Sequence, residues 1–219
     1  MTENSEFLEA AKNGDVATVV SLLDADPQLV SAAGDHDKTA LHWAAEKDHA
    51  EIAQTLIEAG ADIEARTSWG ATPLEWAAVM GSGSVADLLL EKGAGGFTLV
   101  TAAALGKLSD VKKFAQQLTG TGGNNFSDAL HSAARNGHRE TVAYLLGLGG
   151  DIDTKGFFGA TGMHWAAING HHETVEFLLA QGADTSVRDS EFDATPEDWA
   201  LEGGHNSIVE MLRRSAQPS

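Results

Sequence analysis

The sequence predicts an all-α solenoid built from repeated helix–turn–helix motifs. The first observation is a heptapeptide, Thr-Ala-Leu-His-Trp-Ala-Ala at 39–45, which recurs along the chain. The central apolar residues of successive copies keep a constant spacing: Leu41 and Leu74 are 33 positions apart, and so are Leu130 and Met163. Self-similarity at a fixed period of this size indicates stacked repeats. The second observation is that an apolar stripe with helical spacing follows the copies and ends near a glycine.

The copy at 39–45 shows how one repeat is expected to fold. Its first helix is predicted over 39–47, with Thr39 accepting a backbone N–H as the N-cap. Its second helix carries Ile52, Leu56 and Ile57 on one face, and Gly60 is well placed to end it. In the next copy Pro73 stands in the first helical turn, where its missing N–H costs nothing.

These residues resemble the ankyrin repeat family. The shared features are the T-P-L-H-x-A-A opening, the Asn169-Gly170-His171 turn between helices, and the exit sequence at 56–62. The resemblance covers nearly all 219 residues. It implies a single domain over 1–219, with short β-hairpin fingers between about seven repeats that include two caps. The expected repeats span 5–33 (N-terminal cap), 35–66, 68–94, 95–121, 124–153, 156–186 and 190–214 (C-terminal cap).

The regular spacing is interrupted once in the middle of the chain. Leu74 and Leu130 are 56 positions apart, and a degenerate copy centred on Leu99 divides this step into 25 and 31. About eight residues are therefore missing before the fourth repeat, where the family places a finger. We expect a tight glycine-rich turn at 94–96 instead, a notch in the row of fingers, and a weak joint between the third and fourth repeats.

Charge and composition exclude several classes of function. The chain has 14 Lys and Arg against 32 Asp and Glu, a net charge of −18. This opposes binding to nucleic acids and to anionic membranes. The excess of acids either keeps an extended surface soluble or suits a basic partner. The absence of cysteine rules out disulfides and thiolate chemistry. The N-terminal segment is polar and no apolar run approaches the ~18 residues of a membrane span, so we expect a cytoplasmic protein.

Seven of the nine histidines fall into two columns of equivalent positions. The family resemblance implies that the first column bonds neighbouring loop backbone and that the second shapes the turn between helices. A metal site would need several ligands to converge on one point, which columns spaced by a helix diameter do not provide. We therefore expect no metal and no cofactor. The columns are His42, His131 and His164, and His49, His138, His171 and His205.

Tryptophans form a third column, which we interpret as packing between repeats with the indole N–H bonded to a partner. It comprises Trp43, Trp76, Trp165 and Trp199.

Two further columns are not explained by packing and are predicted to bind a partner. One lies at the finger tips and is largely aromatic, and exposed aromatic clusters usually mark interaction surfaces. Its members are His36, Trp69, Asn125, Phe158 and Phe192, with Phe157 beside Phe158. The other lies at the ends of the first helices, on the face that the family makes concave. The predicted contacts there are Val79, Met80, Ala104, Leu105, Arg135, Asn136 and Ile168.

We expect a non-catalytic protein–protein interaction module that binds a helix or an extended segment, basic or aromatic, and is monomeric. Val79, Met80, Ala104 and Leu105 would form the floor of a central cleft; alternatively, the finger aromatics fold back onto neighbouring fingers. A second hypothesis is a small-molecule binder or atypical enzyme, with Asp128 and His131 as an acid–base pair on one helix turn. A third is an oligomeric or purely structural array, in which the finger aromatics are buried in a symmetric contact.

Overall fold

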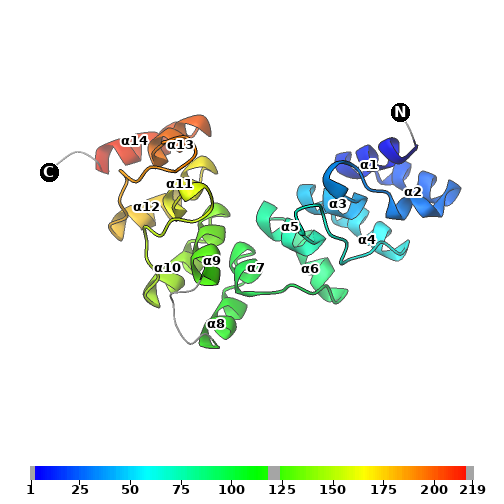
Figure 1. Cartoon of the computed structure of the whole chain (residues 1–219), viewed down its shortest axis with the longest axis horizontal. Helices are drawn as coiled ribbons and strands as arrows, with labels where there is room; N and C mark the ends of the chain where they lie inside the picture. The colour runs from blue at the N-terminus through cyan, green and yellow to red at the C-terminus, as the bar shows by residue number, and fades with distance from the viewer. Residues whose placement is uncertain (1–2, 118–123, 216–219) are drawn as a thin grey trace. The chain divides into compact units, whose positions relative to one another are not determined.

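The computed structural model describes residues 3–117 and 124–215. Within these ranges the chain forms fourteen α-helices and three short 3-10 turns. The contacts divide it into two compact units, Met1–Phe97 and Thr98–Ser219, here called the N-terminal unit and the C-terminal unit. Each unit is a stack of antiparallel helix pairs (Figure 1). The helical repeat architecture predicted from the sequence is confirmed, whereas a single domain over 1–219 stays a prediction.

The N-terminal unit contains three helix pairs. They are α1 (Glu3–Asn13) with α2 (Val16–Ala25), α3 (Ala40–Lys47) with α4 (Ala50–Glu58), and α5 (Pro73–Met80) with α6 (Gly83–Glu91). The 3-10 turns η1 (Pro27–Ser31) and η2 (Asp35–Asp37) join the first two pairs. The core is made by apolar residues that recur at equivalent positions: Phe7, Leu41, Leu56, Leu74 and Leu89 are all buried.

The C-terminal unit contains four helix pairs. They are α7 (Leu99–Ala104) with α8 (Leu108–Gln116), α9 (Asn124–Arg135) with α10 (Arg139–Gly147), α11 (Gly162–Ile168) with α12 (His172–Ala180), and α13 (Pro196–Glu202) with α14 (Asn206–Ser215). The turn η3 (Phe157–Gly159) lies before α11. Leu130, Leu145, Met163 and Leu178 continue the buried row. In the last repeat Glu197 stands at the position of Leu130 and Met163 and pairs with Arg213 at 2.7 Å.

In five repeats a threonine stands immediately before the first helix and is its N-cap residue. Thr72 accepts the N–H of Glu75 at 3.2 Å, and the carboxylate of Glu75 accepts the N–H of Thr72 at 2.9 Å. This reciprocal arrangement satisfies two backbone donors that the helix leaves without partners. The predicted N-cap at Thr39 is confirmed, with His42 replacing the glutamate. Short first helices therefore begin at a fixed place relative to the preceding finger.

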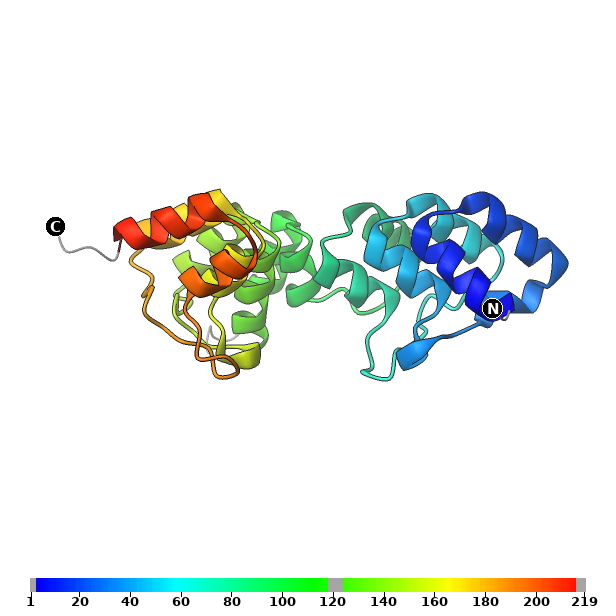
Figure 2. The same ribbon diagram turned by 90° about the horizontal axis from the view of Figure 1, so that it is seen from above.

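The fingers are tight turns rather than β-hairpins. Each is closed by a backbone bond across its base, such as Thr67 N–H to Ala71 C=O at 3.0 Å. Among the described residues the only β-pairing is an isolated bridge between Ala33 and Thr39, because the arms are too short to form a ladder. The four fingers span 34–38, 67–71, 156–160 and 189–194. In each unit they project to one side of that unit's helices (Figure 2).

Among the described residues no finger precedes α7, and residues 118–123, before α9, lie outside the described ranges. Residues 94–98 lead from α6 into α7 through Gly95 and Gly96, and the N–H of Gly95 is held by the carboxylate of Glu64 at 2.6 Å. This agrees with the tight turn expected there. The prediction that Asn125 lies at a finger tip is wrong, because α9 begins at Asn124 and Asn125 belongs to its first turn. The glycine-rich composition of 119–125 predicts a flexible exit from the fourth repeat, and residues 119–123 of it lie outside the described ranges.

Candidate interaction surface

The histidine columns are structural, as the family resemblance implied. In the first column, His164 Nδ1 accepts the N–H of Thr161 at 3.1 Å, and its Nε2 donates to the carbonyl of Ala194 at 3.2 Å. Each of these histidines thus bonds the base of the finger or loop that follows its helix. In the second column, every imidazole bonds a first-helix carbonyl of the preceding repeat, with His171 reaching Arg135 at 2.7 Å.

The proposed acid–base pair does not form a reactive site. His131 is buried and its Nε2 bonds the carbonyl of Thr154 at 2.9 Å, like its column mates. Burial lowers the pKa of His131, and the charge of Asp128 only partly opposes this. Asp128 is exposed. Asp128 and His131 are therefore not directed together at an open site, which is the arrangement that would favour catalysis.

A buried lysine lies between two tryptophans in the N-terminal unit. The ammonium of Lys38 is 4.2 Å from the ring centroids of both Trp43 and Trp76. It also pairs with Glu46 at 2.7 Å, and the indole N–H of Trp76 donates to the same carboxylate at 3.3 Å. Burial acts to raise the pKa of Glu46, but the hydrogen bonds from Lys38, Lys47 and Trp76 outweigh it and hold the pKa below its usual value. The cluster fastens the first finger to α3 and α5.

The tryptophans of this cluster stand out in the sequence as a column, whereas Lys38 and Glu46 do not. A signal was present, because the residue before the capping threonine is alanine at positions 71, 160 and 194 but lysine at position 38. Its partner Glu46 lies in the column at the first-helix ends. Lys38 lies eight positions from Glu46 and 38 positions from Trp76. Comparing repeats therefore finds the unusual lysine but not the residues that it contacts.

An apolar strip leads from the second finger onto α5. Trp69 is 60 % exposed and stacks between His36 and Trp76, with ring centroids at 4.4 and 5.8 Å. Val79 and Met80 follow Trp76 by three and four residues on α5, which places them beside it on the helix surface, and both are exposed. The strip of Trp69, Trp76, Val79 and Met80 is called here the N-terminal surface.

Three exposed phenylalanines occupy the fingers of the C-terminal unit. Phe157 is 72 % exposed, Phe158 41 % and Phe192 73 %. The rings of Phe157 and Phe158 are 4.3 Å apart, and the two fingers are joined by a bond from Ser190 N–H to Phe158 C=O at 2.8 Å. These residues, together with Trp165 and Arg135 described next, are called the C-terminal surface.

A row of aromatic contacts runs beneath these fingers. The guanidinium of Arg135 lies 4.9 Å from the ring of Trp165, which meets Trp199 edge-on at 5.1 Å. The indole N–H of Trp199 donates to the buried Asp189 at 2.9 Å, and Asp189 also accepts the N–H of Phe192 at 2.7 Å. Burial acts to raise the pKa of Asp189, but these donors outweigh it and lower the pKa. The row thus links Arg135 to the finger that carries Phe192.

The remaining predicted contacts are placed less favourably. Ala104 is buried and its carbonyl accepts bonds from His138 and from the amide of Asn136, both at 2.8 Å. Ala104 therefore offers no exposed methyl group to a partner. Leu105 and Ile168 are half-buried. The central cleft would combine Val79 and Met80 from one unit with residues of the other, and it stays a prediction.

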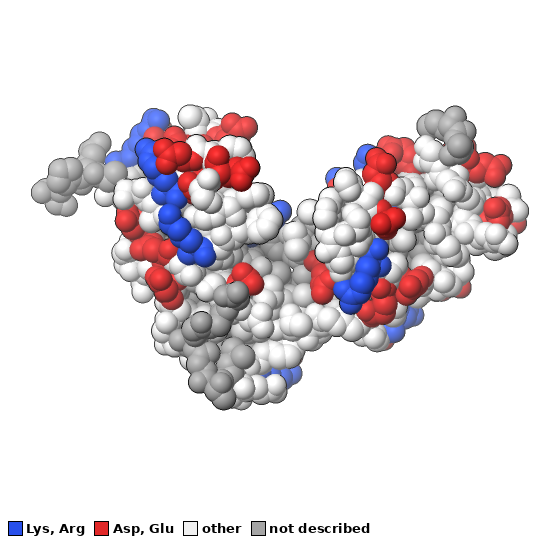
Figure 3. All heavy atoms as spheres, in the orientation of Figure 1, with Lys and Arg blue, Asp and Glu red and all other residues white. Residues whose placement is uncertain are grey.

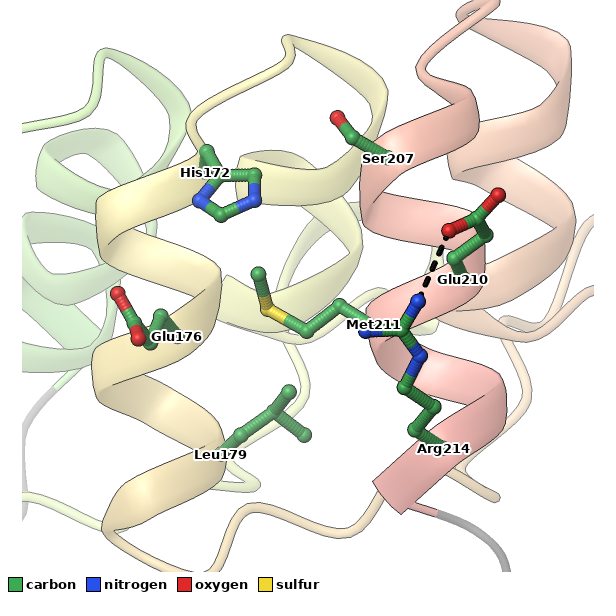
Figure 4. Close-up of a pocket in the computed structure, with 7 residues that line it drawn as sticks. All are labelled: His172, Glu176, Leu179, Ser207, Glu210, Met211 and Arg214. Atoms are coloured by element: carbon green, nitrogen blue, oxygen red, sulfur yellow. Dashed lines mark hydrogen bonds and ion pairs between the residues drawn. The ribbon is translucent and has the colours of Figure 1, made fainter.

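The described residues also contain a shallow hollow of about 410 Å³ between α12 and α14. Figure 4 shows the side chain of Met211 pointing between the two helices and the pairing of Arg214 with Glu210, at 3.1 Å. Its lining is mixed, and no predicted site residue contributes to it. It lies between second helices, away from the columns that carry the exposed aromatics.

Three general properties bear on the class of site. Within residues 3–117 and 124–215 no group of three or more potential ligands could hold a metal ion. None of the helices in this part of the chain is long and apolar enough to cross a bilayer. Acidic side chains are spread over the face shown in Figure 3, and Lys and Arg gather there in narrow groups.

Stacked helix pairs, threonine caps, fingers and histidine bonds between repeats together define a helical repeat protein. The sequence matches the family model "Ankyrin repeats (3 copies)" over residues 7–98, 99–189 and 130–219. The chain belongs to the ankyrin repeat family, whose arrays are in general protein–protein interaction modules. Its structure is similar to that of the human ASB11 ankyrin repeat domain, with a TM-score of 0.53 and 24% identity over 97% of this chain and 98% of that one. That likeness concerns the fold.

Proposed function

We propose that this chain is a non-catalytic recognition module that binds a segment of another protein through its finger tips and the adjoining ends of its first helices. The observation that carries the proposal is the location of the exposed aromatic side chains. Among the described residues, all four exposed Trp and Phe side chains lie on fingers: Trp69, Phe157, Phe158 and Phe192. Monomeric proteins seldom expose such clusters without a binding role.

The fingers are built to hold these side chains in place. Their backbones close on themselves and bond to the neighbouring finger, as Ser68 N–H does to His36 C=O at 2.8 Å. The histidine and tryptophan contacts described above anchor the finger bases. Little entropy is therefore lost when a partner contacts the aromatic rings, and pre-organised aromatic residues are efficient interface anchors.

Site-specific photo-crosslinking tests this proposal. A photoreactive phenylalanine analogue is placed at Phe192 in one variant and at Leu148, which is 41 % exposed at the end of α10, in a control variant. We expect a protein from native lysate to be crosslinked at 192 and not at 148. Substitution of Phe157 by alanine should reduce the crosslinking at 192, while helical signal and melting stay unchanged. Equal labelling at both positions, or none at either, contradicts the proposal.

A further inference from the structure

The N-terminal unit contains an internal example of a cation held over an indole and neutralised by a carboxylate. Lys38 lies over Trp76 at 4.2 Å, and Glu46 supplies the negative charge at 2.7 Å. Glu46 stands five positions after the central residue of its repeat, Leu41, and Trp76 belongs to the following repeat. All three partners come from this chain, so the arrangement is complete without a ligand.

The equivalent place in the C-terminal unit contains the cation and the indole but no carboxylate. Arg135 stands five positions after Leu130, and its guanidinium lies 4.9 Å from Trp165 of the following repeat. Ser127 takes the place of Lys38 and bonds Thr154 instead, at 3.3 Å. Over the part of the chain that the structure describes, the guanidinium of Arg135 has neither an ion pair nor a hydrogen bond.

An unpaired, half-buried guanidinium is unusual in this chain. Asp and Glu outnumber Lys and Arg by 32 to 14, so acids to pair with it are abundant. Burial lowers the pKa of Arg135, yet an arginine stays charged in proteins. The buried acid on the same aromatic row, Asp189, is already bonded to Trp199 and to finger N–H groups. A partly desolvated cation without a counter-ion is costly unless a partner supplies one.

We propose that the C-terminal surface binds a protein segment that carries an Asp or Glu side chain next to bulky apolar side chains. The carboxylate pairs with Arg135 over Trp165, as Glu46 pairs with Lys38 over Trp76. The apolar side chains pack on Phe157, Phe158 and Phe192. A planar guanidinium binds a carboxylate through two parallel hydrogen bonds, which also fixes the position of the segment. This inference rests on the proposed function, and for this surface it replaces the basic partner that net charge alone suggests.

The test is a selection of short random peptides displayed on phage, carried out on the full chain. We expect enriched peptides to carry Asp or Glu beside Phe, Leu or Trp. Arg135→Gln should weaken a selected peptide about tenfold to a hundredfold. Changing its acid to Asn or Gln should have a similar effect, and the two changes together should cost much less than their sum. Arg139→Gln is the matched control, because Arg139 is exposed, pairs with Glu140 and lies over Phe177.

The outcomes separate the inference from the proposed function. If binding is lost in the Phe157→Ala, Phe192→Ala double variant but not in Arg135→Gln, or if enriched peptides are basic or lack acids, the acidic partner is wrong and the recognition surface stands. If no enriched peptide depends on either set, both proposals fail. If the Arg135→Gln variant does not fold, the pair between Arg135 and the peptide acid is measured in two other ways. One is the Arg135→Lys variant, and the other is the change of the peptide's acid to its amide. Peptide binding unaffected by both of these changes overturns the inference.

Discussion

At the scale of single residues, the tip of the third finger has an unusual backbone. Phe158 has φ 61° and ψ 13°, and Gly159 follows with φ 69°. Two successive left-handed residues form a type I′ turn, a position that favours Asn, Asp or Gly and disfavours a bulky side chain. His36 occupies the same conformation in the first finger. Strained residues of this kind persist where their side chains have a use, and here they carry ring systems at the proposed binding surface.

Replacing Phe158 by asparagine is predicted to separate stability from recognition. The left-handed conformation costs an ordinary residue about 1 kcal/mol or slightly more, and asparagine tolerates it. We expect Phe158→Asn to raise the free energy of unfolding of the C-terminal unit by about 1 kcal/mol in urea titrations. The same variant should bind the partner more weakly. Phe157→Asn is the control, since position 157 has no positive φ and should show no gain in stability. A gain of equal size in the control would contradict the explanation.

At the scale of secondary-structure elements, each first-column histidine joins a helix to the finger or loop after it. In two repeats one imidazole both completes the N-terminal cap of its own helix and bonds the base of the following finger. The acceptor role of Nδ1 and the donor role of Nε2 require the neutral ring. Burial lowers the pKa of His42, His131, His138 and His164. These joints are therefore sensitive to acid.

The stability of the protein is predicted to fall as pH drops below about 6.5. The unfolded chain takes up protons on these histidines near their ordinary pKa of 6.5, while the folded chain takes them up only at lower pH. In this range the unfolded state binds more protons than the folded state. The free energy of unfolding therefore falls by up to about 1.4 kcal/mol per pH unit for each extra proton bound. Urea unfolding between pH 8 and 5 measures this slope. His164→Gln should flatten it, whereas His172→Gln, an exposed histidine, should leave it unchanged. Equal slopes in all three proteins would refute the prediction.

Helices, caps and histidine bonds could be predicted from sequence because each is written in a local motif repeated at a fixed period. The position of Asn125 in a helix could not be predicted. Finger tips are placed by counting back from the central residue, here Leu130, and α9 extends through the place where a finger is expected. The β-hairpins expected at the fingers do not form among the described residues, because their arms are too short for a ladder, and the repeat spacing does not show this. The contacts of Lys38 with Trp76 and of Arg135 with Trp165 join neighbouring repeats, and spacing within one repeat does not show them.

At the scale of the whole molecule, the two compact units each have a buried core of their own. The fingers at 36 and 68 are bonded to each other in one unit, and those at 158 and 190 in the other. In repeat arrays stability is close to a sum of repeat and nearest-neighbour terms, so a break in regularity can divide the array into separate cooperative blocks. The boundary at 97–98 coincides with the place where a finger is missing.

We therefore expect the two units to unfold in separate transitions. Leu56→Ala should lower the stability of the N-terminal unit by about 2–5 kcal/mol, and Leu178→Ala that of the C-terminal unit by a similar amount, since both side chains are fully buried. Hydrogen exchange followed by mass spectrometry reports on each unit through its own peptides. The expectation is lost if either variant increases exchange equally in both units.

The missing finger before α7 also affects how tightly a partner can be held. One polypeptide thus carries two aromatic surfaces, one before and one after residue 97 in the sequence. A ligand with two short motifs joined by a linker of suitable length would bind the second motif intramolecularly. Such coupling can raise overall affinity about a hundredfold to ten-thousandfold over either motif alone, without any new contact. Avidity, rather than one strong interface, would then determine which proteins this chain retains.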